Sequence, residues 1–142
     1  MKVSIVAGVS PVVTSARESM AFYGEALGVP FDNPDADYPM TDALAGVEHF
    51  SLWSLTDCAR ACFGTDSWPE DRIVPQANIE FDVESAEAVT EAADELTARG
   101  YTLLVAPKTE PWGQTVTRLQ TPEGLLIGVT FTPWMHVGDS RE

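Results

Sequence analysis

Residues 9–16 are VSPVVTSA, and residues 79–86, seventy positions later, are IEFDVESA. In each stretch, a run of residues suited to a β-strand leads into Ser-Ala, which is a favourable start for a helix. Each half of the chain therefore predicts the same unit: a strand, a capped helix and then further strands. Because neither unit can bury its inner face alone, we expect the two units to pair around a core or a cup.

Capping signals predict three helices. Ser15 and Glu18 form a capping box, and the helix that they start, with Met20, Tyr23 and Leu27 at helical spacing, is expected to end at Gly28. A second helix is expected over residues 85–100, and a shorter one over residues 54–64. On the shorter helix, Cys58 and Cys62 belong to an apolar stripe, so we interpret them as core residues.

Strands are expected at residues 3–13, 47–53, 78–83, 101–105, 116–119 and 125–131. The last two flank Thr121-Pro122-Glu123-Gly124, which suits a type I turn, so they should form a hairpin. Residues 29–46 are expected to be a loop with one short strand. Residues 1–142 are interpreted as one domain with modules over 1–64 and 77–134, a connector over 65–76 and a polar tail over 136–142.

Composition narrows the possible functions. The chain has 142 residues, with 8 Lys and Arg against 22 Asp and Glu, for a net charge of -14. Such a charge repels phosphate backbones and anionic lipids, so we expect no nucleic-acid or membrane partner. No apolar run is long enough to cross a bilayer. With two cysteines and no signal-peptide pattern, a cytoplasmic location is expected.

Two motifs carry a resemblance to a known family. The first is Ser19-Met20-Ala21-Phe22-Tyr23 followed by Leu27-Gly28, and the second is Glu110-Pro111-Trp112-Gly113-Gln114 continuing to Pro122-Glu123-Gly124-Leu125-Leu126-Ile127. In this order, over roughly residues 3–131, they resemble the vicinal oxygen chelate superfamily, which includes glyoxalase I, extradiol dioxygenases and bleomycin resistance proteins.

The resemblance implies an α+β fold in which two βαβββ-like modules form a curved mixed sheet. It also implies a homodimer, since members of the family commonly pair the modules of two chains. A ferredoxin-like split βαβ fold is the alternative.

Metal-dependent members carry His or Glu on the first strand of each module and Glu on the last strand. By the resemblance, those positions fall here on Gly8, Asn78 and Gly128. Glycine has no ligand atom and asparagine is a poor ligand for Zn²⁺ or Fe²⁺, so we expect no metal and no cofactor. The fourth position remains unassigned.

Several polar and aromatic residues are candidates for a binding site. His49 and Glu80 could form an acid–base pair, although a structural hydrogen-bonded pair is the alternative. Trp53 and Trp112 are proposed as aromatic walls, Tyr38 as a lid on a mobile loop, and His49, Glu80 and Gln114 as polar contacts. We expect Trp134 to pack at the end of the sheet and Arg118 to form a surface or strand-pair salt bridge.

The leading interpretation is a protein that binds a small aromatic or cationic organic molecule, as antibiotic-sequestering members of the family do, without metal chemistry. The alternative is a lyase, isomerase or dioxygenase-like enzyme that uses His49 and Glu80. A ligand-free structural or regulatory dimer is a third possibility.

Overall fold

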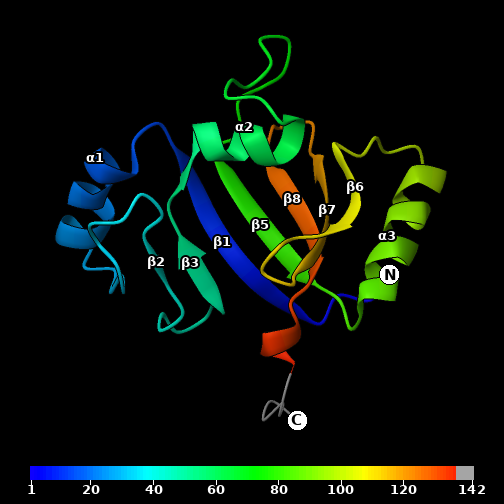
Figure 1. The fold of residues 1–142 in the computed structure, drawn as a ribbon, viewed down its shortest axis with the longest axis horizontal. Coiled ribbons are helices and arrows are strands. Elements are labelled where there is room, and N and C mark those ends of the chain that lie inside the picture. Colours follow the sequence, from blue (N-terminus) through cyan, green and yellow to red (C-terminus); the bar gives the residue numbers. More distant parts are fainter. Residues whose placement is uncertain (137–142) are drawn as a thin grey trace.

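The structure is a computed structural model and describes residues 1–136. Eight strands form one open, mixed sheet in the order β2-β3-β1-β5-β8-β7-β6, with β4 also paired to β1 (Figure 1). The strands are β1 (Ile5–Val13), β2 (Met40–Thr41), β3 (His49–Ser51), β4 (Trp53–Ser54), β5 (Ala77–Asp82), β6 (Val105–Thr109), β7 (Thr115–Gln120) and β8 (Leu126–Phe131). The helices are α1 (Ala16–Met20), the π-helix η1 (Ala21–Ala26), α2 (Leu55–Phe63), α3 (Ala86–Ala98) and the 3-10 turn η2 (Pro133–Met135). The expected α+β architecture with a curved mixed sheet is confirmed.

The two repeated sequences form the centre of the sheet. β1 and β5 pair antiparallel, with Gly8 opposite Glu80 and Ser10 opposite Asn78. In the seventy-residue repeat, residue 8 corresponds to residue 78, and residue 10 corresponds to residue 80. The pairing of 8 with 80 and of 10 with 78 is therefore symmetric, as an approximate two-fold axis between the two strands requires. The modules therefore pair within one chain. A homodimer stays a prediction.

The capped helices form where the sequence predicts them. The Ser85 hydroxyl accepts from the Ala88 amide at 3.0 Å, and α3 packs Val89, Ala92 and Ala93 against the sheet face that carries Val129. The helix that begins at Ser15 widens to a π-helix after Met20 and ends before Gly28, whose φ is +76°. No residue of η1 is buried, and Leu27 just after it is exposed, so the expected buried stripe does not reach Leu27.

α2 covers the opposite face of the sheet. It begins with the Ser54 hydroxyl accepting from the Asp57 amide and ends at Gly64 with a φ of +74°. Cys58, Ala59 and Cys62 are buried against Leu126, as expected for core thiols, and the hydrogen bond with Cys62 and burial raise the pKa of Cys58. Leu126 alternates with Ile127 and so shares a face with Gly128. α2 therefore closes one end of the concave face, across the top of the sheet in Figure 1.

Two strand predictions were wrong in detail. The expected strand over 47–53 divides into β3 and β4, because Leu52 donates its amide to Pro39 and Pro11 of β1 has no N–H to donate. The strand expected over 101–105 begins instead at Val105. The chain leaves α3 through Gly100 at a φ of +94°, and the residue before the strand, Leu104, donates its amide to the Arg118 carbonyl of β7 at 2.8 Å.

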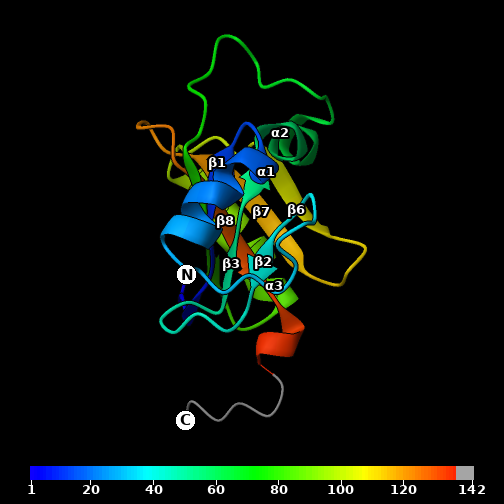
Figure 2. The same cartoon turned by 90° about the vertical axis from the view of Figure 1, so that its left-hand side faces the viewer.

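The C-terminal end also differs from the prediction. His136, assigned to the polar tail, is hydrogen-bonded to the buried Asp82, and the rest of that tail, residues 137–142, lies outside the described residues. Figure 2 shows η2 leaving the sheet below β8. Over residues 1–136, no helix has both the length and the apolarity needed to cross a bilayer.

Candidate functional site

A row of five residues crosses the sheet and forms the floor of the site. Strand register places His49 of β3 beside Gly8 of β1, Gly8 beside Glu80 of β5, Glu80 beside Gly128 of β8, and Gly128 beside Arg118 of β7. Glycine thus separates each of the three polar side chains from the next. Because Gly8 has no side chain, space remains over the floor on the His49 side of Glu80.

A cavity of ≈ 540 Å³ lies over this floor. All six residues predicted to contact a ligand line it: Tyr38, His49, Trp53, Glu80, Trp112 and Gln114. Gly8 and Asn78 line the cavity too, whereas Gly128 does not; a Cβ added at Gly128 would lie 3.2 Å from Cγ of Glu80. The geometry brings the predicted residues together, and their role in binding stays a proposal.

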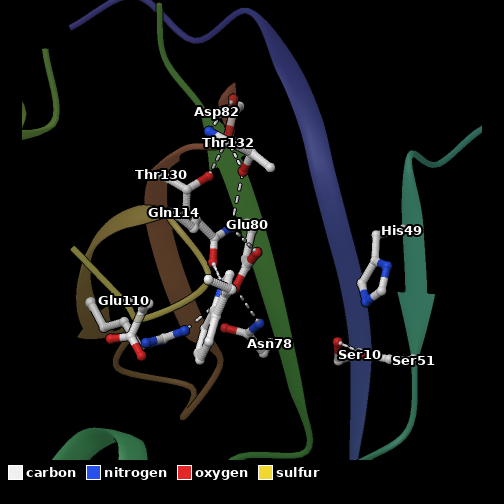
Figure 3. Close-up of polar contacts among 12 residues, drawn as sticks. Ser10, His49, Ser51, Asn78, Glu80, Asp82, Glu110, Gln114, Thr130 and Thr132 are labelled. Carbon is white, nitrogen blue, oxygen red and sulfur yellow. Dashed lines mark hydrogen bonds and ion pairs between the residues drawn. The ribbon is translucent and has the colours of Figure 1, made fainter. Parts of the chain in front are cut away.

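Glu80 is the central charged group of the floor. Its carboxylate accepts from Gln114 Nε2 at 3.2 Å and, at 3.5 Å each, from Arg118 Nη2 and Asn78 Nδ2 (Figure 3). The Glu80 side chain is 17% exposed. Beside it, Arg118 Nε and Asn78 Oδ1 are buried with no hydrogen-bond partner among the described residues. Such unsatisfied buried atoms are uncommon in folded proteins and mark this floor as unusual.

The sequence suggested a surface or strand-pair salt bridge for Arg118. Arg118 does form a salt bridge, but a buried one to Glu80 of β5, which is separated from β7 by β8. Arg118 is only 4% exposed. The centre of its guanidinium lies 5.2 Å from the centre of the Trp53 ring, and one guanidinium nitrogen pairs with the Glu80 carboxylate. The sequence held a usable signal: Arg118 lies four residues beyond Gln114, which directly precedes β7, so alternation along the extended chain turns both side chains to the same side of the sheet.

His49 and Glu80 do not form a pair. They stand on opposite sides of β1 (Figure 3), and both ring nitrogens of His49 are already engaged. Nδ1 lies 2.6 Å from Asp42 Oδ1, and Nε2 lies 2.8 Å from the Tyr38 hydroxyl. Asp42 was not singled out, because it lies in a loop whose folding back onto β3 has no local sequence signal.

Tyr38 is held in place by its neighbours. The Asn33 side chain donates to the Tyr38 carbonyl at 3.0 Å and accepts from the Met40 amide at 2.8 Å, which ties the loop together. Burial of the hydroxyl, with a smaller contribution from Glu80, raises the pKa of Tyr38 to about 12, although a hydrogen bond with Ser51 opposes the shift. The described contacts therefore favour a fixed wall over the predicted mobile lid.

A buried hydrogen-bond network stabilises the wall formed by η2. Asp82, which has no exposed surface, accepts from the Thr132 amide at 3.1 Å, from the Thr132 hydroxyl at 2.9 Å and from the Thr130 hydroxyl. His136 Nε2 lies 2.5 Å from the same carboxylate. The contacts hold Trp134 at the cavity, 54% exposed, so the prediction that Trp134 packs at the end of the sheet was wrong.

The same network orients Trp112. Gln114 Nε2 donates to Thr132 at 3.0 Å and to Glu80, which leaves Gln114 Oε1 to accept from Trp112 Nε1 at 3.3 Å. Trp112 is 59% exposed and presents ring surface to the cavity. An exposed aromatic ring held by a buried network is suited to stacking on a ligand.

The profile of the glyoxalase/bleomycin resistance protein/dioxygenase superfamily matches residues 9–129. The chain belongs to this superfamily. No curated protein matches the chain.

Solved structures with the same fold include a superfamily member from Vibrio splendidus, at 18% identity over 92% of this chain and 100% of that one, with a TM-score of 0.57. The Mn(II)-bound glyoxalase from Novosphingobium aromaticivorans is 20% identical over 92% of this chain and 39% of that one, with a TM-score of 0.60. A Streptomyces coelicolor methylmalonyl-CoA epimerase in complex with 2-nitronate-propionyl-CoA is 13% identical over 93% of this chain and 96% of that one, with a TM-score of 0.56. At these identities the likeness shows the fold alone.

The residues on the floor do not fit the transition metal that some relatives hold. Two of the three assignable ligand positions, Gly8 and Gly128, have no donor atom, and the third, Asn78, offers an amide. His49 is hydrogen-bonded to Tyr38 and Asp42, and the Glu80 carboxylate already accepts from Gln114, Arg118 and Asn78. Among residues 1–136, no group of three or more His, Cys, Asp or Glu side chains is arranged to hold a metal ion. A firm site needs three or four such ligands.

Proposed function

We propose that the protein binds a small planar aromatic molecule in the cavity and holds it without a metal ion. The observation that carries the proposal is the set of aromatic side chains around one space: Tyr38, Trp53, Trp112 and Trp134 all line it. A volume of ≈ 540 Å³ lies within the range of small-molecule sites. Polar groups on the floor, Glu80 and Gln114 among them, would fix the orientation of the ligand.

Sequestration of a toxic aromatic compound, such as an antibiotic, is the role that we propose for this binding. A homodimer and a cytoplasmic location go with it as predictions. The cytoplasmic location rests on the sequence argument from the two cysteines, both of which are free and buried.

Titration with 9-(hydroxymethyl)acridine, a neutral planar tricycle, tests the proposal. Isothermal titration calorimetry should give one saturable site per chain, with quenching of tryptophan fluorescence and a rise in melting temperature, because a ligand that binds only the folded state stabilises it. Failure of this probe and of its charged analogues to bind would refute the proposal.

The alternative, an enzyme that uses His49 and Glu80, has one observation in its favour. Register sets these two groups on either side of Gly8, where they flank one position over the floor. The binding proposal predicts that the acridine is recovered unchanged after long incubation. Chemical conversion that Glu80→Gln abolishes would support the enzyme instead.

A further inference from the structure

The space over Gly8 is bordered by hydrogen-bond acceptors on two sides. A Cβ placed on Gly8 would lie 3.6 Å from Oε1 of Glu80, so that oxygen faces the space directly. On the other side, His49 is the register partner of Gly8, and the Tyr38 hydroxyl is bonded to its ring. Adjacent strands lie about 4.8 Å apart, so the backbones that carry His49 and Glu80 are about 10 Å apart. One small group fits between their side chains.

The hydrogen bonds of His49 determine whether the Tyr38 hydroxyl donates or accepts a hydrogen bond toward a ligand. Because the Asp42 carboxylate only accepts, the tautomer of His49 that satisfies this contact carries its proton on Nδ1. Nε2 then has a lone pair and accepts the Tyr38 O–H at 2.8 Å. With its proton given to His49, the Tyr38 oxygen can only accept further hydrogen bonds; Ser51 is one partner, and a second lone pair remains for a ligand. Tyr38 therefore acts as an acceptor beside the cavity.

The charge of the lining favours a cation. Three carboxylates line the cavity, from Asp57, Glu80 and Glu110, against the single guanidinium of Arg118. Asp57 pairs with Arg60 and Glu110 with Lys108, but these two cations do not line the cavity. That guanidinium stacks on Trp53 and pairs with Glu80 at 3.5 Å, a long contact that compensates the carboxylate only in part. The net charge of -14 on the whole chain adds to the attraction.

We propose that the space over Gly8, between Glu80 and Tyr38, binds a primary or secondary ammonium group of the ligand, while the aromatic ring of the ligand lies against Trp112. The inference rests on the proposed function and names the class of its ligand: an aromatic amine that is protonated at neutral pH. The ammonium donates N–H bonds to the Glu80 carboxylate and to the Tyr38 oxygen. An organic cation thus binds among the strand positions where metal-dependent relatives place metal ligands.

Two isosteric probes test the inference: 9-(aminomethyl)acridine, which is cationic, and 9-(hydroxymethyl)acridine, which is neutral. Calorimetry should give at least tenfold tighter binding of the amine, and the preference should shrink at high salt. Glu80→Gln should remove the preference, whereas Glu123→Gln, which removes the same charge from an exposed turn, should keep it.

Gly8→Ala gives a second test that does not change the charge. The new methyl group would meet only ordinary contacts, at 3.5 Å from the His49 carbonyl and 3.6 Å from Glu80, so the variant should fold. It should lose the amine preference because the methyl occupies the ammonium position. Equal affinity of the wild type for both probes would overturn the inference and leave the proposed function standing. Tighter binding of acridine-9-carboxylate than of either probe would also overturn it and would assign the floor to Arg118. If none of the three probes binds, the proposed function itself fails.

Discussion

Replacing Trp112 by alanine should weaken binding of 9-(hydroxymethyl)acridine about 30-fold, and the magnitude follows from the exposure of the ring. Trp112 is 59% exposed, which for a tryptophan of about 250 Å² leaves about 150 Å² open to solvent. A planar ligand that stacks on one ring face would cover about half of that area. At about 25 cal/mol per Å², this burial contributes about 2 kcal/mol to binding.

The same change should leave the protein folded. The part of Trp112 that is already buried contributes at most about 2.5 kcal/mol to stability by the same area relation, which is an upper estimate. A domain stability of about 5–15 kcal/mol tolerates that loss. The assays are calorimetric titration for affinity and urea denaturation for stability. Tyr101→Ala is the matched control, because Tyr101 is 56% exposed and does not line the cavity. An unchanged Kd, or a Trp112→Ala variant that is unfolded in buffer, would refute the assignment of this ring to the ligand.

Two further predictions concern Asp82 and Tyr38. Asp82→Ala should lower the free energy of unfolding, measured by denaturant titration, by about 3–5 kcal/mol, because the change leaves the Thr132 and His136 donors without their acceptor. The control is Asp94→Ala on the exposed side of α3, which should change the free energy of unfolding by less than about 0.5 kcal/mol in the same titration. Since the pKa of Tyr38 is raised to about 12 and that of an unfolded tyrosine is about 10, the Tyr38 contribution to stability should be complete below pH 10 and should fall as the pH approaches 12. Tyr38→Phe should flatten this alkaline decline, and a decline of the same slope in the variant would show that other groups cause it.

Local sequence signals were enough to place the starts of the helices. Ser15, Ser54 and Ser85 each cap a helix through an amide three residues ahead, and both the donor and the acceptor of such a bond lie within one turn of chain. The seventy-residue repeat likewise predicted that β1 and β5 are equivalent. Strand alternation then predicted that Glu80, two residues beyond Asn78, faces the cup.

The chemistry of the site was decided by tertiary structure. Arg118, Asp42 and His136 have their roles because of partners 38, 7 and 54 residues away in sequence, and no local pattern encodes those contacts. Trp134 became a cavity wall because the buried Asp82 holds the end of β8, and Tyr38 became a fixed acceptor because Asp42 sets the proton on His49. Capping and alternation depend on neighbours along the chain, so the sequence alone determined the elements. Charge pairing and proton placement depend on which side chains meet across the sheet, so only the folded structure could assign them.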